Sequence, residues 1–348
     1  MTVFAGPAGR SRVIPRDDTA VYAQRVLHVT NGDCTVEIMR RAHVVGDIVP
    51  WRDVLHEGPV PTLPPAELRP LRAAHLAAMG PATASRRAPA PTPLALEVEA
   101  DLRARDERLE GAVEAGERVV LWFEHDLYDQ LQLLQILAGL PDRPVGVELI
   151  CVGAFPGRPD FAGLGELEPE ELGSLWPVRA AVTNEHVRAA RAGWDAFRGN
   201  DPSALARMAA TPDAKLPLLA AALRRLLEEL PGVRDGLART ERQLLAAIAV
   251  GARTRERAFT EAAASEEAPF LGDATAFERL DELAGGRQPL VTAAGDDLAL
   301  TAAGADVLAG RADRVALIGF DRWLGGLHLR AEAGLWRWDG ERSAVVAP

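Results

Sequence analysis

The chain of 348 residues contains very little cysteine and lysine. Its two cysteines, Cys34 and Cys151, show no Cys-x-x-Cys spacing, which excludes a disulfide framework and a thiolate metal site. Lys215 is the only lysine among 39 basic residues, a bias typical of a GC-rich genome. A single arginine is therefore weak evidence for an anion-binding clamp, although arginine suits that role.

Long apolar runs are also missing. No stretch approaches the roughly 18 to 20 uncharged apolar residues that a membrane span requires, and the N-terminus lacks the apolar core of a signal peptide. We therefore expect a cytoplasmic protein that contacts no membrane. Hydrophobic residues make up 48% of the chain and charged residues 26%, which excludes wholesale disorder and collagen-like repeats. The length favours two or three domains.

A surplus of positive charge is absent as well. Acidic residues outnumber basic ones by 50 to 39, which gives a formal net charge of −11. General nucleic-acid binders and membrane-surface proteins have the opposite balance, so the composition disfavours nucleic acid as a partner.

The first half of the chain alternates apolar runs with amphipathic segments. The pattern predicts strands at 25–30, 44–49, 118–123 and 145–152, with helices at 34–42, 66–79, 94–116 and 127–140. Strands that alternate with helices favour an α/β fold with a parallel, Rossmann-like sheet. We assign residues 21–180 to this domain, expect a flexible tail at 1–20, and expect a mobile Pro/Ala-rich loop at 81–93.

The second half begins with helical segments and then changes its pattern. We assign a helical connector to 181–235, a winged-helix-like domain to 236–312, and a C-terminal β-rich arm to 313–348. The middle assignment rests on three predicted helices, a short hairpin and a final helix, which is the order of a winged helix.

The charge of the winged-helix segment argues against DNA reading. Between residues 239 and 314 there are nine basic and thirteen acidic residues, a net charge of −4. DNA affinity comes largely from neutralised phosphates, and the expected recognition helix at 274–284 is itself acidic. We therefore expect this segment to pack within the chain or to form a homodimer.

Three predicted strands end in polar clusters. Because ligands of open parallel sheets bind beyond the carboxyl ends of the strands, these clusters are expected to converge on one acidic cleft. The candidate catalytic residues are His125, Glu124, Asp126, Asp53 and His56. The candidate substrate-binding residues are Asn31, Gly32, Asp33, Trp51, Arg52 and Glu57, joined by Trp323 and His328 if the C-terminal arm folds back. A divalent metal is a candidate cofactor, with Asp33, His56 and His125 as its ligands.

Several of these residues have structural alternatives. Asp33 is well placed to cap the helix that starts at Cys34, and Asp129 suits the first turn of the helix at 127–140 without any function. Glu124 would be costly to bury unpaired, so it faces a solvated cleft or pairs with arginine, with Arg52 as the candidate partner. His28, in the middle of a strand, is expected to be a core histidine.

Five segments occur together in this chain: LHVTNGD (27–33), PWRDVLHEGPVP (50–61), LWFEHDLYDQLQLLQIL (121–137), ALTAAGADVLAG (299–310) and DRWLGGLHL (321–329). As a set, they resemble a bacterial family catalogued as a domain of unknown function, number eighteen thirty-five. The resemblance extends from about Arg25 to Asp339. It implies an α/β N-terminal part and a winged-helix-like C-terminal part, and it carries no activity over to individual residues.

The sequence therefore predicts an enzyme that acts on a small polar substrate, nucleotide-like or amine-bearing, in an acidic cleft. The chemistry would be acid–base or metal-assisted hydrolysis or group transfer. Two alternatives remain: a small-molecule-sensing transcriptional regulator with a winged helix, and a non-catalytic dimerisation module.

Overall fold

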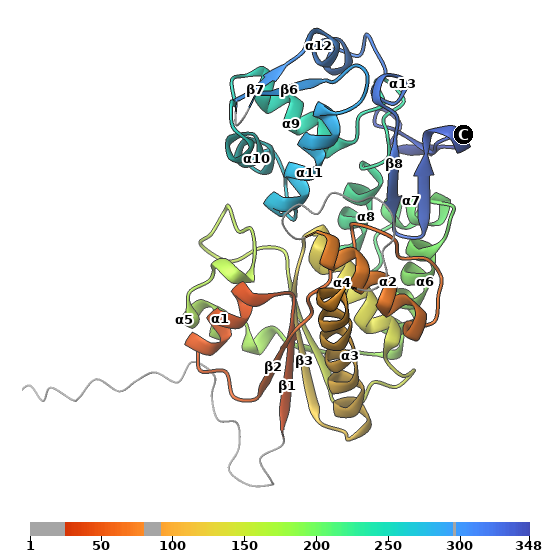
Figure 1. Ribbon diagram of the computed structural model, residues 1–348. Helices are drawn as coiled ribbons and strands as arrows, with labels where there is room; N and C mark the ends of the chain where they lie inside the picture. Colours follow the sequence, from red (N-terminus) through yellow and green to blue (C-terminus); the bar gives the residue numbers. More distant parts are fainter. Residues whose placement is uncertain (1–24, 80–91, 295–296) are drawn as a thin grey trace, which may run out of the picture.

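The computed structural model describes residues 25–79, 92–294 and 297–348. The predicted tail at 1–20 and most of the loop at 81–93 lie outside these residues. The protein is mixed α/β, with a five-stranded sheet in the order β2-β1-β3-β4-β5 (Figure 1). The first four strands are parallel and only β5 is antiparallel. The strands are β1 (Val26–Thr30), β2 (Asp47–Pro50), β3 (Arg118–Glu124), β4 (Val147–Val152) and β5 (Ala180–Ala181).

Helices cover both faces of this sheet (Figure 1). One face carries α1 (Asp33–Arg41) and α5 (Pro169–Ser174), with the short 3-10 turns η1 (Leu164–Glu166) and η2 (Trp176–Val178). The other face carries α2 (Pro65–Ala78), α3 (Pro93–Glu114), α4 (Leu127–Gly139) and α6 (Asn184–Arg198).

The central strand β3 explains this arrangement. Its side chains alternate between the two hydrophobic cores: Leu121 and Phe123 face one, and Val120 and Trp122 face the other. A strand that is buried on both faces must be apolar at nearly every position. Trp122 Nε1 donates a hydrogen bond to His28 Nδ1 at 3.1 Å, which confirms His28 as a core histidine.

The rest of the chain forms a second lobe above the carboxyl ends of the strands (Figure 1). Helices α7 (Ser203–Ala210) and α8 (Leu219–Leu227) still pack into the core of the sheet. A separate hydrophobic core joins α9 (Arg239–Ala249), α10 (Arg255–Ala263), α11 (Asp273–Ala284), the hairpin β6 (Val291–Ala294) and β7 (Asp297–Leu300), and α12 (Ala302–Leu308).

The C-terminal segment contacts both lobes. It contains α13 (Arg314–Ile318), the hairpin β8 (Asp321–Leu324) and β9 (Leu327–Arg330), the turn η3 (Ala331–Ala333), and the hairpin β10 (Arg337–Asp339) and β11 (Ala344–Val346). The tip of the β8–β9 hairpin reaches the end of α6, where Gly326 N–H donates to Phe197 O at 3.0 Å. Because a Cβ at Gly326 would overlap Arg198 O, this close approach requires glycine. Within the described residues, no helix is long and apolar enough to cross a membrane.

Two helical glycines give opposite expectations for stability. A Cβ at Gly111 of α3 would meet nothing within 4 Å, whereas one at Gly193 of α6 would lie 2.8 Å from Leu134 Cδ1. Gly111→Ala should raise the free energy of unfolding by about 0.5–1 kcal/mol, because alanine loses less backbone entropy in a helix. Gly193→Ala should lower it by about 1 kcal/mol or more, because the core must shift. Urea unfolding measures both, and a stabilising Gly193→Ala would contradict the packing of α4 against α6.

Candidate functional site

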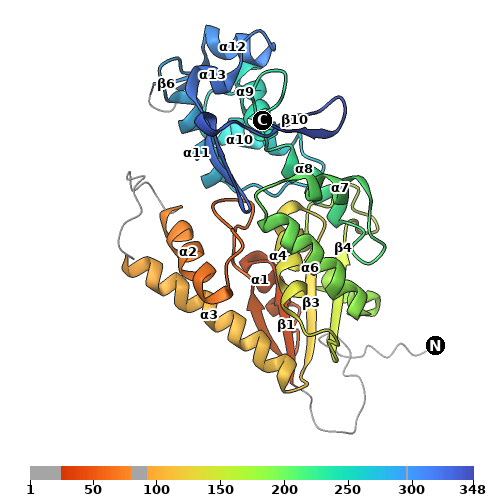
Figure 2. The ribbon, with the colours of Figure 1, turned by 90° about the vertical axis from the view of Figure 1, so that its right-hand side faces the viewer.

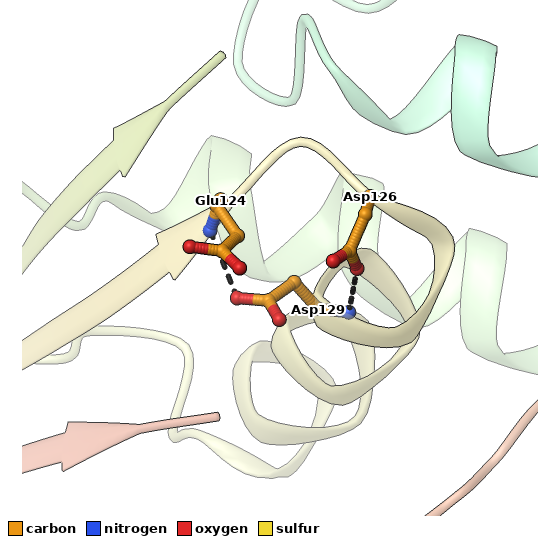
Figure 3. A group of neighbouring side chains, drawn as sticks. All are labelled: Glu124, Asp126 and Asp129. Atoms are coloured by element: carbon orange, nitrogen blue, oxygen red, sulfur yellow. Dashed lines mark hydrogen bonds between the residues drawn. The ribbon is translucent and has the colours of Figure 1, made fainter. Parts of the chain in front are cut away.

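Three carboxylates meet at the turn between β3 and α4 (Figure 3). Glu124 ends the strand, Asp126 is the N-cap of the helix, and Asp129 lies in its first turn. One oxygen from each side chain lies within 4.8 Å of the others, and all three residues are buried. This set is called the carboxylate group below.

The backbone of the turn fixes the carboxylate group. Asp129 N–H donates to Asp126 Oδ1 at 2.8 Å, as in an ordinary helix cap. Glu124 N–H donates to Asp129 Oδ1 at 2.9 Å, which draws the helix carboxylate back toward the strand end. The sequence Glu-x-Asp-x-x-Asp at a strand-to-helix turn thus places all three side chains together.

Two further segments supply hydrogen-bond donors. Asn31, which follows β1, donates through Nδ2 to Asp129 Oδ2 at 2.7 Å and to Glu124 Oε1 at 3.3 Å. Leu164 N–H donates to Glu124 Oε2. A Cβ at Gly163 would overlap the Glu124 carboxylate, so only glycine allows the backbone to come this close. These donors hold the carboxylates in one arrangement and favour their charged forms.

Burial nevertheless opposes ionisation of the carboxylate group. Burial, reinforced by the charge of Asp126, raises the pKa of Glu124 to about 8. Burial likewise raises the pKa of Asp126 to about 7 and that of Asp129 well above its usual value. Within the described part of the chain, no arginine, lysine or histidine forms an ion pair with these groups. The site therefore needs either protons or a bound cation to offset its negative charge.

Asp33 and Arg52 form a separate, exposed pair. Arg52 Nε donates to Asp33 Oδ2 at 2.9 Å and Nη2 to Oδ1 at 2.6 Å, and this guanidinium lowers the pKa of Asp33. The expected pairing of Arg52 with Glu124 is therefore wrong, because backbone and amide donors satisfy Glu124 instead. The expected capping by Asp33 is also wrong, because the N-cap of α1 is Gly32 and Asp33 is the first helical residue.

Asp53 belongs to a buried ion pair. Arg72, itself buried, donates through Nη2 to Asp53 Oδ1 at 2.8 Å. The same guanidinium donates to Val54 O at 2.8 Å and to Glu57 O at 2.6 Å, so it organises the whole segment 53–57. Asp53 therefore contributes to the packing of this segment and does not join the carboxylate group.

Trp51 lies next to this ion pair and is buried. Its Nε1 donates to Gln135 Oε1 at 2.8 Å, and the Arg105 guanidinium lies 4.1 Å from its ring centroid. Trp51 thus faces α3 and α4 and not the end of β3.

The two candidate histidines are both neutral near pH 7. His56 is buried between Tyr128 and Phe270, with ring centroids 6.0 and 5.0 Å away, and neither ring nitrogen has a hydrogen-bond partner. Burial lowers the pKa of His56 to about 3. His125 is half-buried, stacks on Phe161 at 6.0 Å, and has a pKa lowered by burial.

The remaining candidates lie on the second lobe or contact it. Glu57 forms an ion pair with Arg279 of α11. Trp323 stacks on His328 with ring centroids 4.3 Å apart, and His328 Nε2 lies 2.7 Å from Asp321 Oδ1. These three side chains come from the β8–β9 hairpin, and no contact between the described residues links them to the carboxylate group.

The structure thus brings Glu124 and Asp126 together with Asn31, and it adds residues that the sequence interpretation did not select. For Asp129 the sequence predicts only an ordinary first-turn acid, and the signal that marks it as a member of the group is its spacing from Glu124 and Asp126. No sequence pattern marks Gly163 and Leu164 as site residues, because they do not directly follow a predicted strand. The carboxylate group lines neither of two cavities of about 700 and 640 Å³.

Two comparisons with known proteins give no relative. A scan against protein-family models and a search of curated proteins each find no match for this chain. The fold and the carboxylate group define an α/β protein with a candidate cation site, and the family resemblance remains a prediction.

Proposed function

We propose that the protein is an enzyme that holds a divalent cation on Glu124, Asp126 and Asp129. It would hydrolyse or transfer a group of a small polar substrate at the carboxyl end of the sheet. The observation that carries this proposal is the convergence of three buried carboxylates that have no basic partner among the described residues. Hard divalent cations such as Mg²⁺ and Mn²⁺ prefer carboxylate oxygens, and a bound cation would offset the buried charge.

The strand order supports this location. The chain runs from β1 outward to β2 and then crosses to β3 on the other side of β1. In doubly wound, Rossmann-like sheets, ligands bind where the strand order reverses in this way. Asn31 follows β1 and Glu124 ends β3, so the carboxylate group lies at this point.

The surrounding residues would have distinct roles. Asn31 and the Leu164 N–H would orient the ligating carboxylates, as outer hydrogen bonds do in other metal sites. His125, neutral near pH 7 and next to Glu124 in sequence, is the candidate general base. The cation would polarise the substrate or activate a water molecule.

The alternative of a DNA-binding regulator is less well supported. The order of α9, α10, α11 and the β6–β7 hairpin is the order expected of a winged helix, which supports this alternative. However, Arg279 of α11, at the expected recognition position, is buried in an ion pair with Glu57 of the first lobe. Because this contact occupies α11, we infer that the segment serves to pack the second lobe onto the first.

Titration with Mn²⁺ tests the proposed site. We expect the wild type to bind one Mn²⁺ per chain by isothermal titration calorimetry. Asp126→Asn, which keeps the helix cap, and Asp129→Asn should each weaken binding by roughly 10- to 100-fold. Binding to the wild type should tighten from pH 6 to pH 8, because the cation displaces protons from Glu124 and Asp126.

The matched control is Asp33→Asn, which removes an exposed carboxylate near the same strand ends and should leave Mn²⁺ affinity unchanged. Equal binding by the wild type and Asp126→Asn would refute the cation site. Hydrolysis of generic phosphate and carboxylate esters, assayed with and without Mn²⁺, tests the enzyme class. Tight DNA binding with a steep salt dependence would favour the regulator instead.

A further inference from the structure

We propose a second ligand site, for an amphipathic monoanion with an apolar body and one carboxylate, in the cavity between α2, α3, α4 and α6. Two pairs of helices, α2 with α3 and α4 with α6, lie over one face of the sheet (Figure 2). The cavity has a volume of about 640 Å³, within the range of pockets that hold small molecules. It is separate from the carboxylate group, which does not line it.

The wall of this cavity is largely apolar. Each of the four helices contributes apolar side chains to it, among them Leu68, Leu109, Ile136, Leu140 and Trp194. An aliphatic or aromatic body would therefore lose water on entering without leaving polar groups unpaired.

The charged side chains that line the cavity include one more guanidinium group than carboxylate group. Arg72 is paired with Asp53 at 2.8 Å. Arg69 and Arg105 both bind Asp106, at 3.0 and 3.2 Å. Arg105 also lies 3.8 Å from Asp53, so these three guanidinium groups share two carboxylates. Over the whole lining, Arg191 and Arg198 bring the guanidinium groups to five, and Glu110 and Glu114 bring the carboxylates to four. The lining therefore carries one positive charge in excess, which a ligand would neutralise.

This balance selects the charge of the ligand. A monoanion would complete the pairing, whereas a polyanion such as a nucleotide would meet too little positive charge and much apolar wall. Glu110 and Glu114 also line the cavity, but both are exposed, where solvent screens their charge. Arg198 adds a donor, because its buried Nε has no hydrogen-bond partner.

Decanoate is the probe, and its binding is measured by isothermal titration calorimetry below the micellar concentration. We expect saturable binding of one decanoate per chain. Ile136→Trp on α4 and Leu109→Trp on α3, which place larger side chains in the lining, should each abolish it. Arg69→Gln should weaken decanoate binding roughly tenfold, the loss of one charge-assisted contact, and leave binding of decan-1-ol unchanged. Decan-1-ol should bind the wild type more weakly than decanoate.

Arg103→Gln is the control for loss of an arginine, because Arg103 lies on α3, which lines the cavity, but forms an exposed pair with Glu99 outside it. It should bind decanoate like the wild type, and so should Asp126→Asn, which separates this site from the proposed cation site. Absence of saturable binding to the wild type would overturn the proposal. Undiminished binding to both folded tryptophan variants, or equal affinities for decanoate and decan-1-ol, would also overturn it. If one tryptophan variant fails to fold, the other tryptophan variant and Arg69→Gln still test the proposed site.

Discussion

Replacing Arg72 by leucine should lower the free energy of unfolding by about 3 to 5 kcal/mol, the usual cost of removing one partner of a buried ion pair. Arg72 is 1% exposed, and its guanidinium binds Asp53 and the carbonyl oxygens of Val54 and Glu57. The variant would leave the Asp53 carboxylate with only the more distant Arg105, at 3.8 Å. Urea unfolding, monitored by tryptophan fluorescence, measures the change.

Arg103→Leu is the control, because it removes an arginine that forms an exposed ion pair instead of a buried one. Its exposed pair with Glu99 should be worth no more than about 0.5 kcal/mol. The double variant Asp53→Asn/Arg72→Leu should be less destabilised than the sum of the two single variants, because it buries no unpaired charge. An effect of Arg72→Leu as small as that of Arg103→Leu would contradict the role of Arg72 in segment 53–57.

Sequence patterns predict the sheet because its strands are buried on both faces. The runs at 118–123 and 145–152 have no other simple interpretation, and they become β3 and β4 with shifts of at most two residues at either end. The strand expected at 44–49 starts only at Asp47, because a turn precedes it with positive φ at His43 and Gly46. The strand expected after Arg314 begins as helix α13, capped by the Asp313 side chain.

Sequence predicts the members of the candidate site only where they follow neighbouring strands of the sheet. Asn31 and Glu124 meet because β1 and β3 are neighbours and both end in polar residues. Asp33, Asp53 and Glu57 each form an ion pair with an arginine instead. The identity of that arginine decides where each carboxylate lies. Glu57 pairs with Arg279 across 222 residues of sequence. In a chain whose basic residues are nearly all arginine, no residue type marks such a partner in advance.

Without a bound cation, stability should fall by about 2 kcal/mol as the pH rises from 7.5 to 8.5. The pKa values of Glu124 and Asp126 are about 8 and 7 in the folded protein, well above those of unfolded chains near 4. A raised pKa means that the folded state binds more protons, so the stabilisation is full below pH 4 and is lost as the pH rises toward 8. Each proton lost contributes a slope of about 1.4 kcal/mol per pH unit.

Buried histidines act in the opposite direction and in a different range. Burial lowers the pKa of His28 and His75 to about 4 and that of His56 to about 3. Their neutral forms stabilise the fold above the unfolded pKa of about 6.5, and this stabilisation is lost as the pH falls below it. In unfolded chains the histidines are still half protonated at pH 6.5 and about nine-tenths neutral at pH 7.5. Above pH 7.5 the decline therefore reports mainly on the carboxylate group.

The double variant Glu124→Gln/Asp126→Asn should therefore flatten the decline between pH 7.5 and 8.5, because neither amide has a proton to lose. Saturating Mn²⁺ should flatten it in the wild type, since binding to the ionised group stabilises the folded state by mass action. Asp33→Asn is the control: its pKa is lowered, so it is already ionised throughout this range and should leave the slope unchanged. Urea unfolding at each pH gives the slope of stability against pH for the wild type with Mn²⁺, and for the wild type and the two variants with a chelator. A decline that persists in the double variant would mean that the protons are held elsewhere. A decline that is abolished by the substitutions but insensitive to Mn²⁺ would identify the carboxylate group as a proton-sharing core and not a cation site.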